Sequence, residues 1–351
     1  ENQMSYGFGI IGLGLIADFH ARAINAMQDG KLVACCSRNQ EKADKFAKKY
    51  KCKGYSSLDQ FLGHPGLDIV NICTPSGAHL EPALAAAEAG KHLIVEKPLE
   101  ITLSRCDQII RACEKKEVKL TSIFESRFFK LTSIIKKAVD QGRFGQMVLC
   151  DAYIKWYRSQ EYYDKGGWRG SLKLDGGGAL MNQSIHAVDL LQYFAGEVEE
   201  IQALTETIGH QRIDVEDNAI ALLRFRSGAL GVIEGSTSVY PGFLKRIELS
   251  GTKGSVIMEE EDLKTWCFTK ELPEDREIRN QFISRTKSGG GASDPGSIDF
   301  RGHQYQFENM AEAIKNNNEP LINGYEARKA VEIILGIYKS AREGKRVKLP
   351  L

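Results

Sequence analysis

The sequence predicts an α/β protein with two domains: a doubly wound parallel sheet at the N-terminus, then an α+β domain with a large, mostly antiparallel open sheet. A chain of 351 residues is long enough for about two domains. Over the first third, apolar runs alternate with helical stretches. After about residue 126, segments with β character follow one another through short connections. We therefore expect domains over 1–126 and 127–351.

Strands and helices alternate in the first domain. The expected strands are 6–11, 31–37, 68–73, 92–95 and 119–124. Helices are expected from the glycine-rich turn at 12–17 to about residue 27, and over 39–50 and 78–89. Parallel strands need crossover connections, so this alternation indicates βαβ units with helices on both faces of a parallel sheet.

The second domain combines many strands with few helices. The expected strands are 146–157, 201–208, 218–225, 229–237, 245–249, 255–259 and 265–268. The expected helices are 130–141, 179–194, 302–316 and 325–343. Connections such as 226–228 and 251–254 suit hairpins. The Gly/Ser-rich segment 288–297 is interpreted as a surface loop in preference to a lid over the substrate.

Composition excludes several classes of function. The formal net charge is +1, so no global field favours nucleic acid or an anionic membrane. No apolar stretch reaches the roughly 18 residues of a membrane span, and the start does not resemble a signal peptide. The eight cysteines form no Cys-x-x-Cys pair and have no nearby histidine at ligand spacing. We therefore expect no metal site and a protein of the reducing cytoplasm.

A glycine-rich turn follows the first strand. Gly12 permits a tight turn, Gly14 lets the backbone approach a pyrophosphate, and Ala17 takes the small position where the helix packs on the strand. The helix that follows offers free N–H groups and a positive dipole end to that anion. In a βαβ context this pattern predicts a Rossmann dinucleotide-binding domain, with Gly12, Gly14, Leu15 and Ile16 as candidate cofactor contacts.

The end of the second strand bears on the choice of cofactor. An acidic residue there would bind the ribose 2′-hydroxyl of NAD, but this chain has Ser37 and Arg38. A hydroxyl and a guanidinium suit a 2′-phosphate, which favours NADP over NAD. The alternative is that Arg38 stacks on adenine and that NAD is the cofactor.

Two groups suited to proton transfer stand far apart in the sequence. Lys97 follows the strand 92–95, at the sheet edge where open α/β folds bind ligands. Asn182, His186 and Asp189 recur at helical spacing on one face, where Asp189 could orient His186. The structural alternatives are a surface lysine and a core histidine. Together with the glycine turn, the pair indicates a nicotinamide-dependent oxidoreductase acting on a hydroxyl or carbonyl group.

Several spaced motifs resemble one known family, the glucose–fructose oxidoreductase / inositol dehydrogenase / rhizopine catabolism (Gfo/Idh/MocA) family. They are Gly12 to Ala17, Thr74-Pro75 with His79, Gly90-Lys91-His92, Glu96-Lys97-Pro98, and Gly176 to Gly178 through Asn182, His186 and Asp189. The resemblance covers essentially the whole chain. It implies NAD(P)-dependent oxidation or reduction of sugars and cyclitols, and homodimers or homotetramers that often form through the open sheet.

The same resemblance assigns roles to individual residues. It implies that Lys97 and His186 are the acid/base pair, and that Thr74, Pro75, His79, Glu96 and Lys97 itself lie in the cofactor-binding region. Many members carry an aspartate where this chain has Asn182, which also belongs to the candidate catalytic set. Asparagine cannot relay a proton, so we expect Asn182 to position a substrate hydroxyl. The Met181-Asn182-Gln183 sequence is similar to members that act on nucleotide-linked amino sugars.

Substrate contacts are expected from the second domain. The candidates are Tyr157, Arg158, Trp168 and Arg169, which precede the glycine run, and Arg127, which could face the nicotinamide. Aromatic faces pack on sugar rings, and arginine binds carboxylate or phosphate; the alternative is packing within the domain. Two other functions remain open: a non-catalytic NAD(P)-binding sugar sensor or co-regulator, and an NAD-dependent glycosidase. Lys97 and His186 argue against the sensor.

Overall fold

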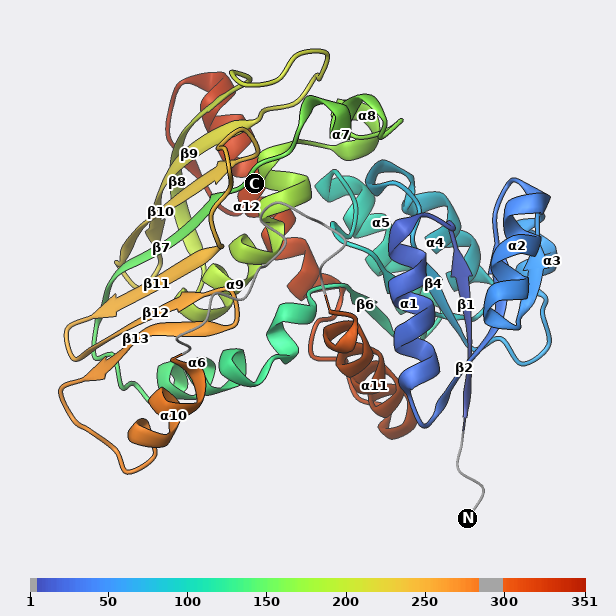
Figure 1. Cartoon of the computed structure of the whole chain (residues 1–351), viewed down its shortest axis with the longest axis horizontal. Helices are drawn as coiled ribbons and strands as arrows, with labels where there is room; N and C mark the ends of the chain where they lie inside the picture. Colours follow the sequence, from blue (N-terminus) through green and yellow to red (C-terminus); the bar gives the residue numbers. More distant parts are fainter. Residues whose placement is uncertain (1–4, 284–298) are drawn as a thin grey trace. The chain divides into compact units, whose positions relative to one another are not determined.

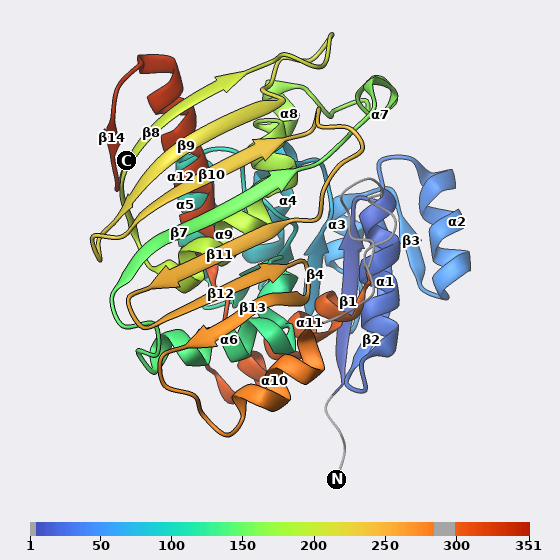
Figure 2. The ribbon, with the colours of Figure 1, turned by 60° about the vertical axis from the view of Figure 1, so that its left-hand side comes forward.

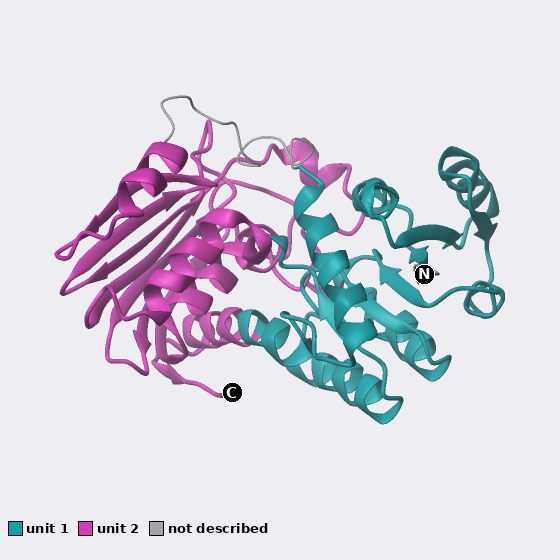
Figure 3. Cartoon of the chain, turned by 90° about the horizontal axis from the view of Figure 1, so that it is seen from below, with its two compact units in different colours: residues 1–125, 299–331 teal, residues 126–298, 332–351 magenta. Residues whose placement is uncertain are grey.

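The computed structural model describes residues 5–283 and 299–351, so the Gly/Ser-rich segment 288–297 lies outside the described residues. The chain forms two compact units, one of residues 1–125 and 299–331 and one of residues 126–298 and 332–351 (Figure 3). Residues 299–331, which the sequence pattern placed in the second domain, therefore belong to the first unit. They return there because Phe307 and Met310 complete its apolar core.

The first unit is built on a parallel sheet with the strand order β3-β2-β1-β4-β5-β6. Its strands are β1 (Tyr6–Ile11), β2 (Gly30–Cys36), β3 (Lys53–Tyr55), β4 (Ile69–Ile72), β5 (His92–Val95) and β6 (Leu120–Ser122). Every residue of β1 and β4 is buried, as expected for strands covered on both faces. The order reverses at β1, as in a doubly wound sheet.

Helices cover both faces of this sheet (Figure 1). They are α1 (Leu15–Ala26), α2 (Gln40–Tyr50), α3 (Leu58–Leu62), α4 (Leu80–Glu88), α5 (Leu103–Lys115) and α11 (Arg301–Asn316), together with the short 3₁₀ helix η1 (Ser76–Ala78). The side chains of Asn39, Ser57 and Thr102 cap α2, α3 and α5 by accepting backbone N–H bonds. Strand β3 and helices α3 and α5 were not anticipated from the sequence.

The second unit contains a mixed, mostly antiparallel sheet with the order β13-β12-β11-β7-β10-β9-β8-β14, in which only β7 and β10 pair in parallel. Its strands are β7 (Met147–Lys155), β8 (Val198–Glu206), β9 (Asn218–Phe225), β10 (Leu230–Ser236), β11 (Arg246–Gly251), β12 (Gly254–Glu259), β13 (Asp262–Phe268) and β14 (Val347–Lys348). The predicted fold class is confirmed by these two sheets.

One face of this sheet is covered and the other is open (Figures 1 and 2). Side chains alternate between buried and exposed along β9, and α9 (Ile185–Ala195) packs on the buried face against β7 and β11. On the open face, Leu204, Ile220 and Leu222 are 73%, 54% and 55% exposed. The described residues also form the helices α6 (Lys130–Asp140), α7 (Gln160–Asp164), α8 (Leu172–Asp175), α10 (Asp275–Phe282) and α12 (Gly324–Glu343) and the 3₁₀ helix η2 (Glu125–Phe128).

The segment expected to be one helix over 179–194 is two. A π-helix, η3 (Ala179–Ser184), leads into α9 (Ile185–Ala195). The wider π turn changes the angular spacing of Asn182 and His186 from that of a continuous α-helix. Among the described residues, no helix is both long and apolar enough to cross a membrane.

Candidate active site

The carboxyl edge of the parallel sheet gathers most of the predicted cofactor residues within the first unit. The adjacent strands β2, β1, β4 and β5 end at Cys36, Ile11, Ile72 and Val95. The segments that follow these ends carry Ser37 and Arg38, the turn from Gly12 to Ile16, Thr74 and Pro75, and Glu96 and Lys97. Ligands of open α/β sheets bind at this edge.

The glycine turn has the geometry of a dinucleotide cradle. Gly12 has φ +88°, and a Cβ there would lie 2.7 Å from the carbonyl carbon of Cys73. Gly14 caps α1 without a side-chain bond, and a Cβ at Gly14 would meet nothing within 4 Å. The space beside Gly14, at the start of α1, is therefore open, and Leu15 is exposed there. These features fit a bound pyrophosphate.

The end of β2 is tied to the neighbouring strand. The Ser37 N–H donates to the Tyr55 carbonyl at 3.0 Å, and the Ser37 hydroxyl accepts the Asn39 N–H at 3.3 Å. Arg38 is exposed. The backbone at Ser37 is therefore fixed, while the Arg38 side chain projects into solvent at the edge where a ribose would lie.

His79 connects two of the edge loops. Its buried ring places Nδ1 2.9 Å from the Pro98 carbonyl and Nε2 3.0 Å from the Thr74 carbonyl. Burial lowers the pKa of His79, so the ring carries one proton and donates to one carbonyl at a time. The ring thus joins the turn after β4, which contains Thr74 and Pro75, to the cis Lys97–Pro98 peptide.

Glu96 is buried beneath Lys97 and is held by two histidines. Its Oε2 accepts the Lys97 backbone N–H at 3.0 Å, and its Oε1 lies 2.8 Å from His20 Nε2 and 3.7 Å from His303 Nε2. Burial alone would raise the pKa of Glu96, but the interactions with His20 and His303 hold it well below its usual range. Neither histidine was anticipated, because His303 is remote in sequence and His20 belongs to no motif we used.

In the second unit, Asn182 is fixed by its neighbours. Its Nδ2 donates to Asp175 Oδ1 at 2.5 Å, and its Oδ1 accepts from Gln183 Nε2 at 3.0 Å. Gln183 Nε2 also donates to the Tyr162 hydroxyl at 2.9 Å, and Gln183 Oε1 accepts from Arg158 Nη2 at 2.8 Å. The amide of Asn182 therefore has a defined orientation, as a group that positions a substrate hydroxyl requires. Half-buried His186 follows in the first turn of α9.

The glycine run before Asn182 packs against protein side chains. A Cβ at Gly177 would lie 2.1 Å from the Tyr338 hydroxyl, and one at Gly178 would lie 2.0 Å from the Glu216 carbonyl oxygen. The close neighbours of the run are therefore Glu216 and Tyr338. The run is needed to seat the π-helix.

Buried Glu216 anchors that π-helix. Its carboxylate accepts the N–H groups of Gly178 at 2.9 Å and Leu180 at 2.8 Å and the Tyr338 hydroxyl at 2.8 Å. Glu216→Gln replaces one of the two acceptor oxygens by an amide donor that faces another donor, so we expect it to lower the free energy of unfolding by about 1–3 kcal/mol. Urea unfolding measures the loss, and Tyr338→Phe, which removes the bond to Glu216 and the 3.3 Å bond that the hydroxyl accepts from the Met181 N–H, should cost about 1–2 kcal/mol. Equal stability of Glu216→Gln and the unmodified protein would contradict this role.

Arg127 and Asp189 form a buried ion pair. Asp189 accepts from Arg127 Nε at 2.8 Å and from Arg127 Nη2 at 2.6 Å, and the guanidinium lies 4.3 Å from the centre of the Tyr193 ring. The sequence suggested that Asp189 orients His186 and that Arg127 faces the nicotinamide. In the structure each of these charges is paired with the other, which fixes α9 inside the second unit, and the two predicted roles stay predictions.

The other substrate candidates form an arginine–aromatic cluster. The buried guanidinium of Arg158 donates to the Tyr157 carbonyl at 2.8 Å and lies 5.6 Å from the Tyr162 ring centre. Arg169 lies 4.7 Å from the same ring and 5.3 Å from that of Trp168. These residues lie near Asn182 through Gln183, although the charge of Arg158 is largely enclosed.

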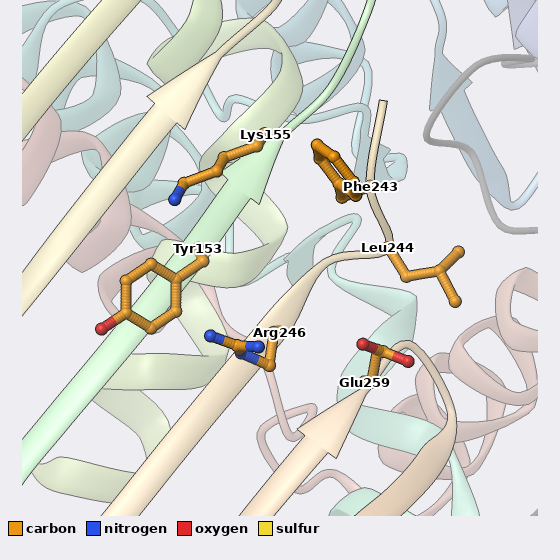
Figure 4. A pocket seen from close by; sticks show the side chains of 6 residues that line it. All are labelled: Tyr153, Lys155, Phe243, Leu244, Arg246 and Glu259. Atoms are coloured by element: carbon orange, nitrogen blue, oxygen red, sulfur yellow. The ribbon is translucent and has the colours of Figure 1, made fainter. Parts of the chain in front are cut away.

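A cavity of about 280 Å³ lies on the open face of the second sheet (Figure 4). It is lined by Tyr153, Lys155, Phe243, Leu244, Arg246 and Glu259. None of the predicted site residues lines this cavity. Arg246 lies 5.1 Å from the centre of the Tyr153 ring, and Lys155 pairs with Glu234 at 2.8 Å.

Comparisons with known proteins match both parts of the chain. Residues 6–124 match the model of an oxidoreductase family with an NAD-binding Rossmann fold, and residues 133–257 match that of the GFO/IDH/MocA C-terminal domain. Myo-inositol 2-dehydrogenase of Thermotoga maritima is 28% identical over 97% of this chain and 98% of its own length.

Two crystal structures share the whole fold. The WlbA dehydrogenase from Bordetella pertussis, in complex with NADH and UDP-GlcNAcA, has a TM-score of 0.89 at 32% identity, covering 99% of this chain and 98% of its own. The WlbA dehydrogenase from Chromobacterium violaceum, with the same two ligands, has a TM-score of 0.89 at 30% identity, covering 100% and 98%. The chain therefore belongs to the GFO/IDH/MocA family of oxidoreductases with an NAD-binding Rossmann domain.

Proposed function

We propose that this chain is an NAD(H)-dependent dehydrogenase of a nucleotide-linked sugar, and that a UDP-linked, N-acetylated sugar acid is its substrate class. The oxidoreductase activity toward CH–OH groups of sugars or cyclitols follows from the family. The finer assignment is supported by one observation above all: two structures that match this chain almost end to end at 30–32% identity are complexes with NADH and UDP-GlcNAcA. The fixed Asn182–Gln183 pair and the adjoining arginines suit a polar, anionic sugar derivative.

Lys97 and His186 are the proposed acid/base pair. Nicotinamide supplies the hydride acceptor at C4 when the cofactor is bound. In the oxidation, the Lys97 amine or the His186 imidazole takes the proton of the substrate hydroxyl as the C–H bond of the same carbon breaks and its electron pair leaves as hydride. In the reduction, the same group returns the proton to the oxygen. Asn182 holds the hydroxyl in place through its oriented amide.

The segment Ser37-Arg38 sets the cofactor preference in either of two ways. The relatives' complexes contain NADH, and Arg38 is exposed where it can stack on adenine. We therefore propose NAD as the physiological cofactor, with the NADP preference as the competing expectation. If Arg38 binds a 2′-phosphate, Arg38→Ala will raise the KM for NADP selectively. If Arg38 stacks on adenine, the change will raise both KM values alike.

The test of the substrate class is a panel of sugars, cyclitols and UDP-sugars, each incubated with NAD⁺ and NADP⁺ while reduced nicotinamide is followed. Turnover restricted to UDP-linked sugar acids supports the proposal, and turnover of free cyclitols alone contradicts the substrate class. Product formation with retained cofactor and no net reduction would identify the glycosidase alternative. Binding without turnover would identify the sensor.

The open face of the second sheet is the proposed contact between copies of this chain, in a dimer or tetramer of the cytoplasm. Leu204, Ile220 and Leu222, on the adjacent strands β8 and β9, are exposed together on this face. A buried unpaired carboxylate costs several kcal/mol, so Leu222→Glu should convert the assembly to monomers in light scattering. Leu321→Glu, an exposed leucine of the first unit, is the control. An unchanged mass for Leu222→Glu would place the interface elsewhere.

A further inference from the structure

Three buried titratable side chains meet in the core of the first unit. His20 comes from α1, Glu96 from the segment after β5, and His303 from α11, and they are 0%, 6% and 3% exposed. The mechanism proposed above uses neither histidine. Two charges and a polar ring buried together are costly unless they are paired, so their arrangement calls for an explanation.

The hydrogen bonds define where the protons lie. Asn71 Nδ2 donates to His20 Nδ1 at 2.9 Å, so the proton of His20 is on Nε2 and is donated to Glu96 at 2.8 Å. Burial lowers the pKa of His20, which agrees with a neutral ring. For His303, burial alone would lower the pKa, but the carboxylates of Glu96 and Glu125 raise it. Glu96 thus lies between two rings, and the raised pKa favours the protonated form of His303 while the lowered pKa favours the neutral form of His20.

A metal ion is the less suitable occupant. The three donor atoms lie within 4.8 Å of one another, which is close enough to consider one. However, the 2.8 Å contact between His20 and Glu96 requires the Nε2 proton that a metal would displace. The second Glu96 oxygen is already bound to the Lys97 N–H. The contacts are those of a proton-sharing network.

The network acts on Lys97 in two ways. Glu96 holds the Lys97 backbone at 3.0 Å, and His20 and His303 hold Glu96, so three elements fix the place of the lysine. The negative charge of Glu96 would also favour the charged form of the Lys97 amine, and a positive charge on His303 offsets this effect. The interaction is mutual, because Lys97 lowers the pKa of His303. Without the positive charge of His303, the negative charge of Glu96 is no longer offset, and Lys97 becomes a weaker acid.

We propose that His20 and His303 are positioning residues for Lys97, with His303 setting its charge and Glu96 transmitting both effects. The benefit to catalysis rests on the proposed function; the effect on Lys97 itself does not. A general base works best when it is uncharged near the operating pH. His303 therefore favours the uncharged Lys97 amine, which can accept a proton. His20 holds the Glu96 carboxylate in place through its N–H donor.

The direct test measures the reactivity of Lys97 without substrate. Limiting acetic anhydride is applied across a pH series, and acetylation of Lys97 is quantified by mass spectrometry in the unmodified protein, His303→Gln and His20→Gln. His303→Gln should move the midpoint to higher pH and slow labelling below the midpoint by about tenfold. His20→Gln, which keeps a donor, should shift it less. His64→Gln, a ring bonded to Tyr55 in the same unit, should leave it unchanged.

Two further readouts separate this proposal from a merely structural role. Nitrogen NMR of the unmodified protein should show His303 protonated and His20 neutral at neutral pH, and two neutral rings would overturn the proposal. With a substrate, His303→Gln should lose about tenfold in kcat at neutral pH, regain it at higher pH, and keep its cofactor KM. An unshifted labelling midpoint in folded His303→Gln would also overturn it. Absence of turnover by the unmodified protein would instead overturn the proposed function.

Discussion

Lys97→Met is expected to lower kcat by a factor of about 10²–10⁴, because methionine fills the space of the lysine stem but carries no transferable proton. The backbone N–H that donates to Glu96 is kept, so the strand end should retain its position. Cofactor affinity should stay close to that of the unmodified protein. Steady-state rates and NADH binding by fluorescence measure both quantities.

The control for this change is Lys91→Met. Lys91 donates to the Leu67 carbonyl at 2.9 Å in the same unit and has no assigned part in the chemistry, so kcat should be unchanged. His186→Ala should lower kcat in the same direction as Lys97→Met. A Lys97→Met variant with full kcat would remove Lys97 from the acid/base pair.

Asp189→Ala is expected to destabilise the second unit by about 3–5 kcal/mol, because it leaves the guanidinium of Arg127 buried without its carboxylate. The two side chains are each 1% exposed, so water cannot take the place of the lost partner. Urea unfolding followed by circular dichroism measures the change.

Two variants check that the missing partner is the cause. Asp189→Leu combined with Arg127→Met removes both charges and should recover much of the lost stability. Asp164→Ala breaks an exposed pair with Arg212 and should leave the unfolding midpoint nearly unchanged. A loss for Asp189→Ala as small as that for Asp164→Ala would show that the pair contributes little.

Features encoded by neighbouring residues could be predicted from the sequence. Gly12 and Gly14 lie beside a strand and a helix start, and Lys97 follows a strand end, so local patterns placed them at one sheet edge. The alternation of exposed and buried residues in β9 likewise matched its expected span of 218–225.

Features that depend on distant contacts could not be predicted. The π-helix η3 is held by Glu216 and Tyr338, which no periodicity near Asn182 reveals. The i, i+4, i+7 pattern linked Asp189 to His186, but it could not reveal that Asp189 also pairs with Arg127, which is distant in the sequence. The return of α11 to the first unit, which brings His303 to Glu96, depends on a tertiary core and leaves no local signal.

The most direct test of the central claim is the transfer of hydride itself. The protein is incubated with NAD⁺ and a UDP-linked N-acetylated sugar acid that carries deuterium on its ring carbons, and the recovered nucleotide is examined by mass spectrometry. The proposed function predicts one deuterium on the reduced nicotinamide with the unmodified protein and almost none with Lys97→Met. Oxidised sugar without deuterium in the nucleotide, or unchanged sugar across the whole panel of UDP-linked acids, would contradict it.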